Sequence, residues 1–529
     1  MAAPLLIGCS GARDVPSLLQ DAKGLPREVD LIEVRLDRFE SPEDVDLDQL
    51  RRALGRPAVL TVRTRAEGGE YGRSAASRRG LLEAADRAGF DWIDLESDLA
   101  GEIPRGRAAR ILSWHGNTRG DGEEPVRELS RFDGDVIKVA AQVPDAATAL
   151  CFVRSATAAG RALGRKVVAI AMGLEGRYLR PLAGKFEMPL LYAAIHPSRK
   201  TAAGQITVAE ALSVHRAGGI RPDTEVFAVA GADVTRSLSP RAHNQVFWSL
   251  ARNAVYVDLS AERFEHVAEV ARELPLSGLS VTAPHKLAAL QFAATAESPA
   301  REIGAANTLT RLEDGTFSAA NTDAEGFLAA LELARGDPAA VLELTLGRSA
   351  EALLRLDAEQ APPEGAPPLE SALIYGSGGV ARAIAWALLQ RGVRIAITGR
   401  SPAGPTRLAL TLGRGAEAIS TTRARSLRFD LLVKAVADEA WDSLPVDPFD
   451  YSREGLAADV VITPLETNFL LAARRAGRVG IPGLLMFSEQ AVWQAVRFTG
   501  EPPSVVRPAI CAGIEAGIHL AGRRSAGDA

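Results

Sequence analysis

Eight short apolar segments recur through the first 218 residues, and most are separated by stretches that suit a helix. Strand-sized apolar runs that alternate with helical stretches predict parallel strands joined by helices. The connection after the fourth segment carries little helix signal. Eight such repeats in about 220 residues predict a compact (β/α)8 barrel over 1–218. The segments are 4–10, 31–37, 58–64, 92–97, 110–116, 135–141, 167–173 and 189–195.

Beyond the barrel, the pattern predicts a further α/β unit built from two domains. Gly and Pro residues near 217–225 mark the boundary. We expect a first domain over 225–333 and a Rossmann-like domain over 371–489. Between them, residues 334–370 include "APPEGAPPLES" and are expected to form a linker or an insertion. Helical apolar spacing predicts that the stretch at about 490–529 packs back on the first of these domains.

Composition restricts the class of protein. A length of 529 residues favours about three domains, and a net charge of −5 without a dense basic run argues against a nucleic-acid surface. No apolar run is long enough for a membrane span, and the N-terminus lacks the pattern of a signal peptide. Cys9, Cys151 and Cys511 are few and far apart, so we expect a reducing compartment and no metal site. The expectation is a cytoplasmic soluble protein, monomeric or homodimeric, that acts on small molecules.

Lys138 is an unusual residue for the sixth apolar segment. It stands among Val136, Ile137 and Val139, where an ammonium group without a partner is costly to bury. Lysine is also scarce, with seven among 61 basic residues. An apolar pocket favours the neutral amine, which is a nucleophile toward ketones. The alternative is a lysine at a strand end that reaches solvent.

Other polar residues lie within the apolar segments or follow them, near one end of the expected barrel, where barrel enzymes carry their active sites. His115 could move a proton beside an imine, and arginines could hold a carboxylate on the substrate. Buried ion pairs or a core histidine would explain single members of this group, but they explain the whole group less well. The other members are Glu33, Arg35, Arg63, Glu67, Arg180 and Gln205.

Six motifs in this region resemble those of type I 3-dehydroquinate dehydratases. They are "EVRLD" (33–37), "TVRTRAEGG" (61–69), "SWHG" (113–116), "IKVA" (137–140), "MG…LRPLAG" (172–184) and "TAAGQ" (201–205). The resemblance implies a Schiff base on Lys138, general acid/base catalysis by His115, and Glu67 as the acidic residue beside it. It also implies substrate contacts at Glu33, Arg35, Arg63, Arg180, Thr201 and Gln205.

The chain departs from this family at three places. Gly116-Asn117 stands where the family usually has Asp-Phe, and Leu179 replaces the serine before the arginine. The segment "TAAGQ" replaces Ser-Ala-Pro-Gly-Gln, although Thr201 keeps a hydroxyl group there. We expect substrate contact to be retained and the orientation of His115 to be affected by Gly116.

The following region resembles shikimate dehydrogenases. The segments are "TRSLSPRAHNQVF" (235–247), "GLSVTAPHK" (278–286), "GAANTL" (304–309) and "AANTDAEGF" (319–327), with Arg236 and Ser280 as departures. The resemblance implies a catalytic pair of Lys286 and Asp323, which would protonate and hold the oxygen of a reduced ketone. The alternative for Lys286 is a surface lysine at a helix start. The implied substrate contacts are Ser237, Ser239, Thr282, Asn307 and Gln490.

A glycine-rich turn indicates a nucleotide site. "YGSGGVA" has G-x-G-x-x-A spacing, follows a predicted strand and opens a predicted helix, as pyrophosphate binding requires. The next strand ends in Gly399-Arg400-Ser401, and an arginine there suits a 2′-phosphate, so we predict NADP. The alternative is an ordinary loop arginine. The expected cofactor-binding residues are Gly376, Ser377, Gly378, Gly379, Val380, Ala381, Arg400, Ser401 and Gly483.

The cofactor side also departs from the family. The usual Asn-Ala-Thr stretch and the following Gly-Met have no counterpart in "LLVKAVADEAWDSLP" (431–445), and Ile462 replaces a tyrosine.

Together the motifs predict a bifunctional enzyme of the shikimate pathway. The barrel would dehydrate 3-dehydroquinate to 3-dehydroshikimate, and the second module would reduce that product to shikimate with NADPH. Three alternatives remain open at this stage. The second module could be a quinate dehydrogenase, possibly with NAD, or a non-catalytic metabolite sensor. The chain could also be a barrel aldolase fused to another reductase.

Overall fold

The computed structural model describes residues 3–345, 368–437, 441–442, 444 and 447–527. Most of the predicted linker at 334–370 and part of the segment at 431–445 lie outside these residues. The chain forms two compact units. One comprises Met1–Pro240 with Asn253–Leu276, and the other comprises Arg241–Arg252 with Ser277–Ala529. Among the described helices, none is long and apolar enough to cross a membrane.

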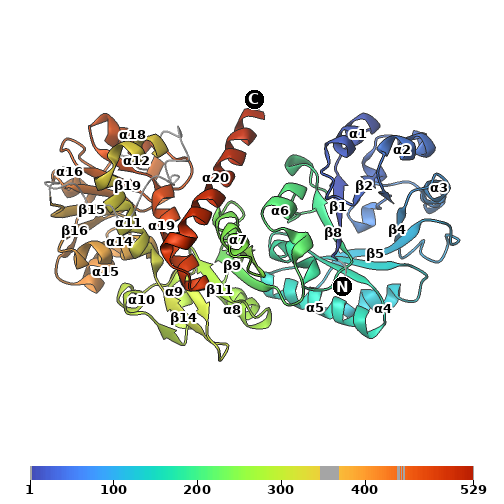
Figure 1. Ribbon diagram of the computed structural model, residues 1–529, viewed down its shortest axis with the longest axis horizontal. Helices are drawn as coiled ribbons and strands as arrows, with labels where there is room; N and C mark the ends of the chain where they lie inside the picture. Colours follow the sequence, from blue (N-terminus) through green and yellow to red (C-terminus); the bar gives the residue numbers. More distant parts are fainter. Residues whose placement is uncertain (1–2, 346–367, 438–440, 443, 445–446, 528–529) are drawn as a thin grey trace. The chain divides into compact units, whose positions relative to one another are not determined.

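The first unit contains eight parallel strands in the order β7-β6-β5-β4-β3-β2-β1-β8 (Figure 1). Each of the eight predicted segments overlaps one of them, and β5 and β6 extend beyond the segments predicted at 110–116 and 135–141. Hydrogen-bond ladders join every pair of neighbouring strands in this order. Within the described residues, no ladder joins β7 to β8. The predicted barrel is therefore confirmed, and it is nearly closed. The strands are β1 (Leu5–Ser10), β2 (Leu31–Arg35), β3 (Ala58–Thr61), β4 (Trp92–Glu96), β5 (Ala109–Asn117), β6 (Val136–Gln142), β7 (Val167–Met172) and β8 (Leu190–Ala194).

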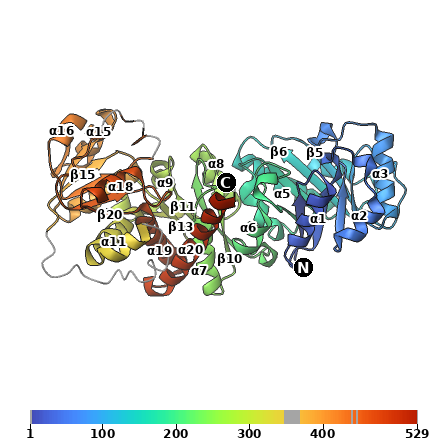
Figure 2. The ribbon, with the colours of Figure 1, turned by 90° about the horizontal axis from the view of Figure 1, so that it is seen from above.

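Helices cover the outside of the strands, as α1, α2, α3 and α5 show in Figure 2. In α2, Leu47, Leu50 and Leu54 are buried, and the side chain of Asp46 caps the N-terminus. β4 leads to β5 without a helix, as the weak helix signal predicted. The α-helices are α1 (Val15–Gly24), α2 (Leu47–Leu54), α3 (Ala75–Arg87), α4 (Glu123–Leu129), α5 (Ala146–Ala162) and α6 (Val208–Ser213). The 3-10 helices are η1 (Leu36–Arg38), η2 (Pro42–Asp44), η3 (Arg65–Glu67), η4 (Arg177–Gly184), η5 (Pro197–Arg199) and η6 (Ala217–Gly219).

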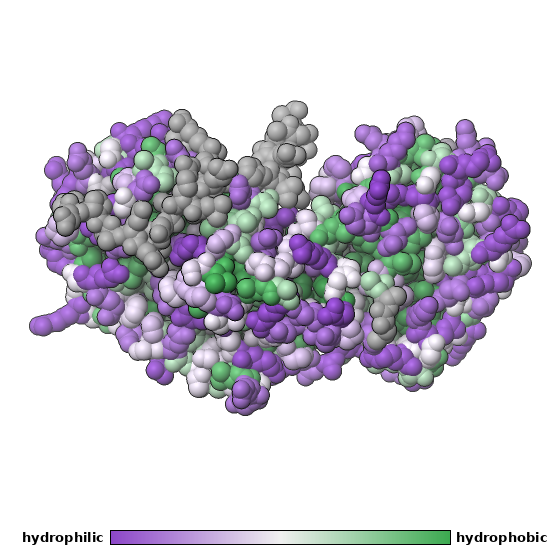
Figure 3. Space-filling model, viewed as in Figure 1, coloured by the Kyte–Doolittle hydropathy of each residue, from purple (hydrophilic) through white to green (hydrophobic). Residues whose placement is uncertain are grey.

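Apolar side chains of the strands fill the barrel unit. Ile7, Val34, Leu60 and Ile111 are fully buried. On the face drawn in Figure 3, hydrophilic residues cover much of the barrel surface and hydrophobic residues show between them. This distribution is ordinary for a folded protein in water.

The register of β5 and β6 determines which side chains face the barrel interior. Ser113 lies opposite Lys138, and His115 lies opposite Ala140. Because side chains alternate along a strand, all four project to the same side. His115, Lys138 and Ala140 line the cavity described below, so this side is the interior.

The first unit continues past the barrel into the start of the next domain. β9 (Glu225–Gly231) and β10 (Ala254–Ser260) pair in parallel, and α8 (Phe264–Glu273) follows. Within this unit α8 contacts α5, and β10 contacts η4. These contacts attach the β9-β10-α8 segment to the outside of the barrel.

The second unit contains two groups of strands. β11 (Gly278–Val281), β13 (Thr308–Arg311), β14 (Phe317–Ala320) and β12 (Thr295–Ala296) are neighbours in this order, and only the last pair is parallel. A parallel sheet follows with the order β17-β16-β15-β18-β19-β20. Its strands are β15 (Ser371–Tyr375), β16 (Arg394–Thr398), β17 (Ala416–Ala418), β18 (Leu431–Lys434), β19 (Leu456–Asp459) and β20 (Val479–Ile481).

The strand order of the parallel sheet reverses between β15 and β18, as in a doubly wound nucleotide-binding sheet. The predicted Rossmann-like fold is therefore confirmed. The described helices of this unit are most of α7 (Ser239–Ser249), α9 (Lys286–Phe292), α10 (Ser298–Ile303), α11 (Thr322–Gly336), α12 (Pro338–Thr345), α14 (Gly379–Gln390), α15 (Ala403–Leu412), α16 (Thr421–Arg425), α18 (Asn468–Arg475), α19 (Gly483–Thr499) and α20 (Pro503–Gly527).

Helix α19 packs closely against α11. At their crossing, a Cβ atom on Gly326 would lie 2.6 Å from the backbone nitrogen of Gln490, so a larger residue would force the helices apart. This approach brings Gln490 next to the start of α11.

Candidate active sites

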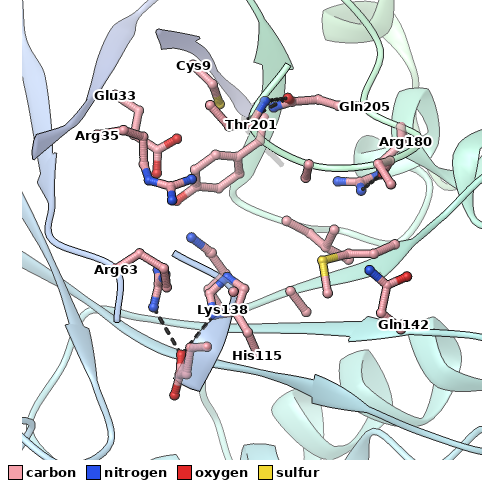
Figure 4. A pocket seen from close by; sticks show the side chains of 18 residues that line it. Cys9, Glu33, Arg35, Arg63, His115, Lys138, Gln142, Arg180, Thr201 and Gln205 are labelled. Carbon is pink, nitrogen blue, oxygen red and sulfur yellow. Dashed lines mark hydrogen bonds and ion pairs between the residues drawn. The ribbon is translucent and has the colours of Figure 1, made fainter. Parts of the chain in front are cut away.

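A cavity of about 260 Å³ lies in the barrel and is lined by side chains from several strands and loops (Figure 4). The nine residues predicted for the barrel site all line it. Figure 4 shows Lys138 and His115 on one side, with Arg180, Thr201 and Gln205 across from them. The sequence analysis did not identify other lining residues, which include Cys9, Gln142 and Tyr192.

Lys138 is buried at the cavity and has an anionic partner. Its Nζ atom lies 2.9 Å from Oδ2 of Asp94 and 4.7 Å from the centre of the Tyr192 ring. The residue is 4% exposed, which excludes the alternative of a lysine that reaches solvent. Burial alone would raise the pKa of Asp94, but Arg63 and Lys138 outweigh it and hold that pKa well below its usual range. Asp94 therefore stays ionised beside the amine.

His115 and Glu67 form a pair at the same cavity, with 3.0 Å between Nδ1 and Oε2. Burial, followed by the charges of Arg63 and Lys138, lowers the pKa of His115 well below its usual value. Burial raises the pKa of Glu67 to about 8. At neutral pH the imidazole is therefore neutral and able to accept a proton, while most Glu67 side chains are protonated.

Arg63 lines the cavity, but its guanidinium is bound by the protein itself. It donates to Glu67 and Glu96 at 3.1 Å each and to Asp94 at 2.8 Å. It also donates to Ser113 at 2.8 Å. These partners make Arg63 an organiser of the acidic groups around Lys138.

Arg180 differs from the other cavity arginines. Arg35 is held by both oxygens of Asp37 at 2.8 Å, whereas no carboxylate within the described part of the chain pairs with Arg180. Arg180 donates to the carbonyl of Ala203 at 3.3 Å, and burial lowers its pKa to about 10. A buried cation without a counter-ion suits a ligand that carries an anionic group.

The segment opposite Lys138 is held by internal hydrogen bonds. The backbone nitrogen and the hydroxyl of Thr201 donate to the amide oxygen of Gln205 at 3.1 and 3.2 Å. The side chain of Glu33, on β2, accepts a hydrogen bond from Thr61 at 3.0 Å. The barrel cavity thus combines one amine, one imidazole and one uncompensated guanidinium.

A second cluster lies in the second unit. Lys286, the first residue of α9, forms an ion pair with Asp323, the second residue of α11. The two residues are 8% and 2% exposed, which excludes a surface lysine. Asn307 donates at 2.9 Å to Asp323 and at 2.9 Å to Gln490. The structure thus brings four predicted residues together.

Gln494 also supports this cluster, and the sequence analysis missed it. Its side chain donates to the backbone carbonyl of Asn307 at 3.3 Å and accepts a hydrogen bond from Ser280 at 2.8 Å. Gln494 lies one helical turn after Gln490 on α19, and this spacing is a signal that could have identified it.

Three other predicted substrate contacts lie near element ends. Thr282 is half-buried and follows β11 directly in the second unit. Ser237 and Ser239 belong to the first unit, where the backbone nitrogen of Ser239 donates to the hydroxyl of Ser237 at 3.2 Å.

The glycine-rich turn joins β15 to α14, as predicted. Gly376 has a φ of 129°, and a Cβ atom there would lie 2.6 Å from the carbonyl of Ala435. Gly378 caps α14 without a side-chain hydrogen bond, which leaves backbone N–H groups available at this helix start. A Cβ atom on Gly379 would lie 3.0 Å from the Lys286 side chain. The start of α14 therefore reaches the Lys286–Asp323 pair.

The other predicted cofactor residues surround this turn. Val380 is half-buried and Ala381 is buried on α14, while Arg400 and Ser401 are exposed after β16. A Cβ atom on Gly404 would lie 2.3 Å from the hydroxyl of Ser377, so the start of α15 closely approaches the turn. Gly483 begins α19. A tight glycine turn, free helix-start amides and an exposed arginine fit an NADP molecule.

A buried ion pair occupies the ends of β18 and β19, where the usual Asn-Ala-Thr stretch is missing. Lys434 lies 2.9 Å from Asp459, and both side chains are fully buried. Thr467 also donates to Asp459 at 2.6 Å. The family pattern does not predict a buried ion pair at this edge of the cofactor domain.

Comparisons with known proteins identify the families that the two parts of the chain resemble. Residues 11–221 match the Type I 3-dehydroquinase family, and residues 229–309 match the shikimate dehydrogenase substrate binding domain. The bifunctional 3-dehydroquinate dehydratase/shikimate dehydrogenase of Arabidopsis thaliana is 29% identical over 510 residues, 92% of this chain and 80% of that protein. The NADP(+) shikimate dehydrogenase of Rubrobacter xylanophilus is 33% identical over 306 residues, 56% of this chain and 96% of that protein.

Solved structures also resemble parts of this chain. The shikimate dehydrogenase of Thermus thermophilus, in complex with NADP(H) and shikimate, is 30% identical with a TM-score of 0.43, and the match covers 55% of this chain and all of that one. The S. pombe dehydratase and dehydrogenase structure is 20% identical with a TM-score of 0.39 over 96% of this chain and 98% of that one. From the sequence matches, we conclude that this chain belongs to the shikimate dehydrogenase family and carries a type I 3-dehydroquinase domain fused ahead of it.

Proposed function

We propose that the barrel converts 3-dehydroquinate to 3-dehydroshikimate through an imine on Lys138, and that the second module reduces this product to shikimate with NADPH. The observation that carries the proposal is that all nine residues predicted for the barrel site line one cavity. The proposed division is dehydratase at 1–218, dehydrogenase substrate domain at 225–333 with helices of 490–529, connection at 334–370, and NADP domain at 371–489.

In the barrel, Lys138 would act as the nucleophile. After losing a proton, its amine adds to the ketone carbonyl, and loss of water gives the imine. The ionised Asp94, 2.9 Å from Nζ in the free protein, would then stabilise the positively charged imine. The imine acts as an electron sink when a proton leaves the adjacent carbon. Hydrolysis at the end releases the product and restores the lysine.

His115 would transfer the proton in the elimination. Its neutral imidazole takes the proton from the carbon and delivers it to the leaving hydroxyl, so that water departs. Arg180 would bind the substrate carboxylate, because it is the buried cavity arginine that lacks a carboxylate partner among the described residues. Thr201 and Gln205 would contact the substrate hydroxyl groups from the same side. Glu33, Arg35 and Arg63 would complete the binding site.

The Glu67–His115 pair gives a pH-dependence prediction. Below a pH of about 8, most Glu67 side chains are protonated. Above that pH, Glu67 is a carboxylate, which makes His115 a stronger base. We expect the dehydratase kcat of the wild type to rise as the pH passes through 8. Glu67→Gln should lose this rise and keep roughly the low-pH rate at all pH values. A rise of equal size in Glu67→Gln would show that another group titrates.

In the second module, bound NADPH would supply the hydride that reduces the ketone. Lys286 would donate the proton to the resulting alkoxide, and Asp323 would hold Lys286 in place. Asn307 and Gln490 would orient the substrate next to this pair, with Ser237, Ser239 and Thr282 as further contacts. The glycine-rich turn from Gly376 to Ala381 would bind the pyrophosphate of NADPH. Arg400 and Ser401 would bind its 2′-phosphate.

A coupled assay tests the proposed function. Full-length protein that receives 3-dehydroquinate and NADPH should consume one NADPH per 3-dehydroquinate, and NADH should be used more slowly because it lacks the 2′-phosphate. Dehydration without any NADPH consumption would contradict the second half of the proposal and favour the sensor alternative. Faster oxidation of quinate than of shikimate would favour the quinate dehydrogenase.

We also propose that the protein acts in the cytoplasm as a monomer or homodimer. The three cysteines form no disulfide, which supports a reducing compartment. Its expected partners are the small-molecule substrates, without nucleic acid and without a membrane.

A further inference from the structure

Arg177 connects three segments of the first unit through one buried guanidinium. Nε donates to Oδ2 of Asp258 at 2.6 Å, and Nη2 donates to Glu210 at 3.0 Å. Nη1 donates to the backbone carbonyl of Gln205 at 3.3 Å. These partners belong to β10, α6 and the loop before α6, so Arg177 joins parts of the chain that are distant in sequence.

Two segments joined at Arg177, η4 and the loop before α6, carry substrate contacts of the proposed dehydratase. Arg177 lies on η4, the same short helix as Arg180, and its bond to Gln205 ties η4 to the 201–205 segment. Arg180 strengthens this connection by donating to Ala203. The position of Arg177 therefore determines where the guanidinium of Arg180 lies relative to Lys138 across the cavity.

One partner of Arg177, Asp258, comes from outside the barrel. Asp258 lies on β10, within the residues that match the shikimate dehydrogenase substrate binding domain, and in the same compact unit as the barrel. It is 4% exposed, and Arg177 is 6% exposed. A buried guanidinium requires compensating charge, which Asp258 and Glu210 supply. Burial lowers the pKa of Arg177, but these two carboxylates outweigh it and raise the pKa overall.

We propose that Asp258, although it belongs to the dehydrogenase part of the sequence, is a positioning residue for the dehydratase site. Through Arg177 it fixes η4 and thereby sets Arg180 for the substrate carboxylate. This inference rests on the proposed role of Arg180. Asp258 touches neither the substrate nor the reacting atoms, so its loss affects substrate binding more than the chemistry on Lys138.

The test uses the full chain with Asp258→Ala and Asp258→Asn. We expect KM for 3-dehydroquinate to rise about tenfold in the alanine variant and about threefold in the asparagine variant, which keeps the shape but loses the charge. The dehydratase kcat should stay within about twofold, because Lys138 and His115 are untouched. A merely structural tie would lower the amount of folded protein and leave KM unchanged.

A matched control exists in the same unit. Arg154 on α5 and Glu273 on α8 form an exposed ion pair that also joins the barrel to the β9-β10-α8 segment. Exposed pairs contribute little to stability, so Glu273→Ala should keep the wild-type KM. Arg177→Gln should raise KM as Asp258→Ala does, and the double variant should add little to either single change.

Wild-type KM values in Asp258→Asn and Asp258→Ala would overturn the proposal, and Asp258→Asn decides alone if the alanine variant does not fold. Arg180→Ala separates this failure from a failure of the proposed function. If Arg180→Ala raises KM while the Asp258 variants do not, only the positioning role is wrong. If Arg180→Ala leaves KM unchanged, the proposed carboxylate site is wrong, and the inference fails with it.

Discussion

Lys138→Ala is expected to lower the dehydratase kcat by at least about 10⁴-fold, because no other group near the cavity can form the covalent intermediate. Among the described residues, Lys138 is the sole lysine that lines the cavity. Borohydride added during turnover of the wild type should reduce the imine and leave a stable adduct. Mass analysis of peptides should locate that adduct at Lys138, and Lys138→Ala should show none.

Lys166 provides the control for this experiment. It lies just before β7 and is exposed, outside the cavity. Lys166→Ala should keep the adduct and the wild-type rate. Substantial dehydration by Lys138→Ala, or an adduct on another lysine, would refute the imine mechanism at this position. NADPH-dependent reduction of 3-dehydroshikimate by Lys138→Ala should remain at the wild-type level and would show that the chain is folded.

The ion pair with Asp94 affects how this lysine works. The carboxylate of Asp94 lies 2.9 Å from the Nζ atom of Lys138 in the free protein. A carboxylate at this position would favour the positively charged imine proposed on Lys138 and so would stabilise the intermediate. The apolar surroundings that the sequence suggested are therefore only part of the environment of Lys138.

The barrel could be predicted from the sequence because its signal is local and repeated. Each apolar segment overlaps a strand, and even the missing helix between β4 and β5 followed from the residues there. Asp94 shows the limit of this reasoning. In "WIDLES" it is a polar residue in an apolar segment, just as Lys138 is, but only the folded barrel shows that the two side chains meet. Side-chain partners across strands depend on tertiary structure.

Contacts between residues that are distant in the sequence could not be predicted, for the same reason. Arg177 and Asp258 are 81 residues apart, and Ser280 and Gln494 are 214 residues apart. No periodicity or motif links the members of either pair. The resemblance to two families identified residues that meet the substrate, but it could not identify the ones that hold these residues in place. Arg63 shows this too, since its carboxylate partners emerged only from the fold.

Lys286→Ala is expected to reduce the dehydrogenase kcat by about 10³-fold or more, because the alkoxide would lose its proton donor. Asp323→Asn should have a similar effect, since Asp323 holds both Lys286 and Asn307. The dehydratase activity of each variant serves as an internal control for folding and concentration. Unchanged turnover in Lys286→Ala would show that the proposed proton donor is wrong.

NADPH binding has to be measured in the same variants, because Lys286 also contacts the cofactor turn. The backbone at Gly379 approaches the Lys286 side chain so closely that a Cβ atom would lie 3.0 Å from it. Removing that side chain opens space at the start of α14, where the pyrophosphate would bind. A fluorescence titration that gives the wild-type Kd for NADPH would assign the lost turnover to proton transfer. A weaker Kd would instead assign part of the loss to packing of Lys286 against the turn. Asp323→Asn, which keeps the Lys286 side chain itself, provides the comparison: wild-type Kd with lowered turnover in that variant would assign its loss to catalysis.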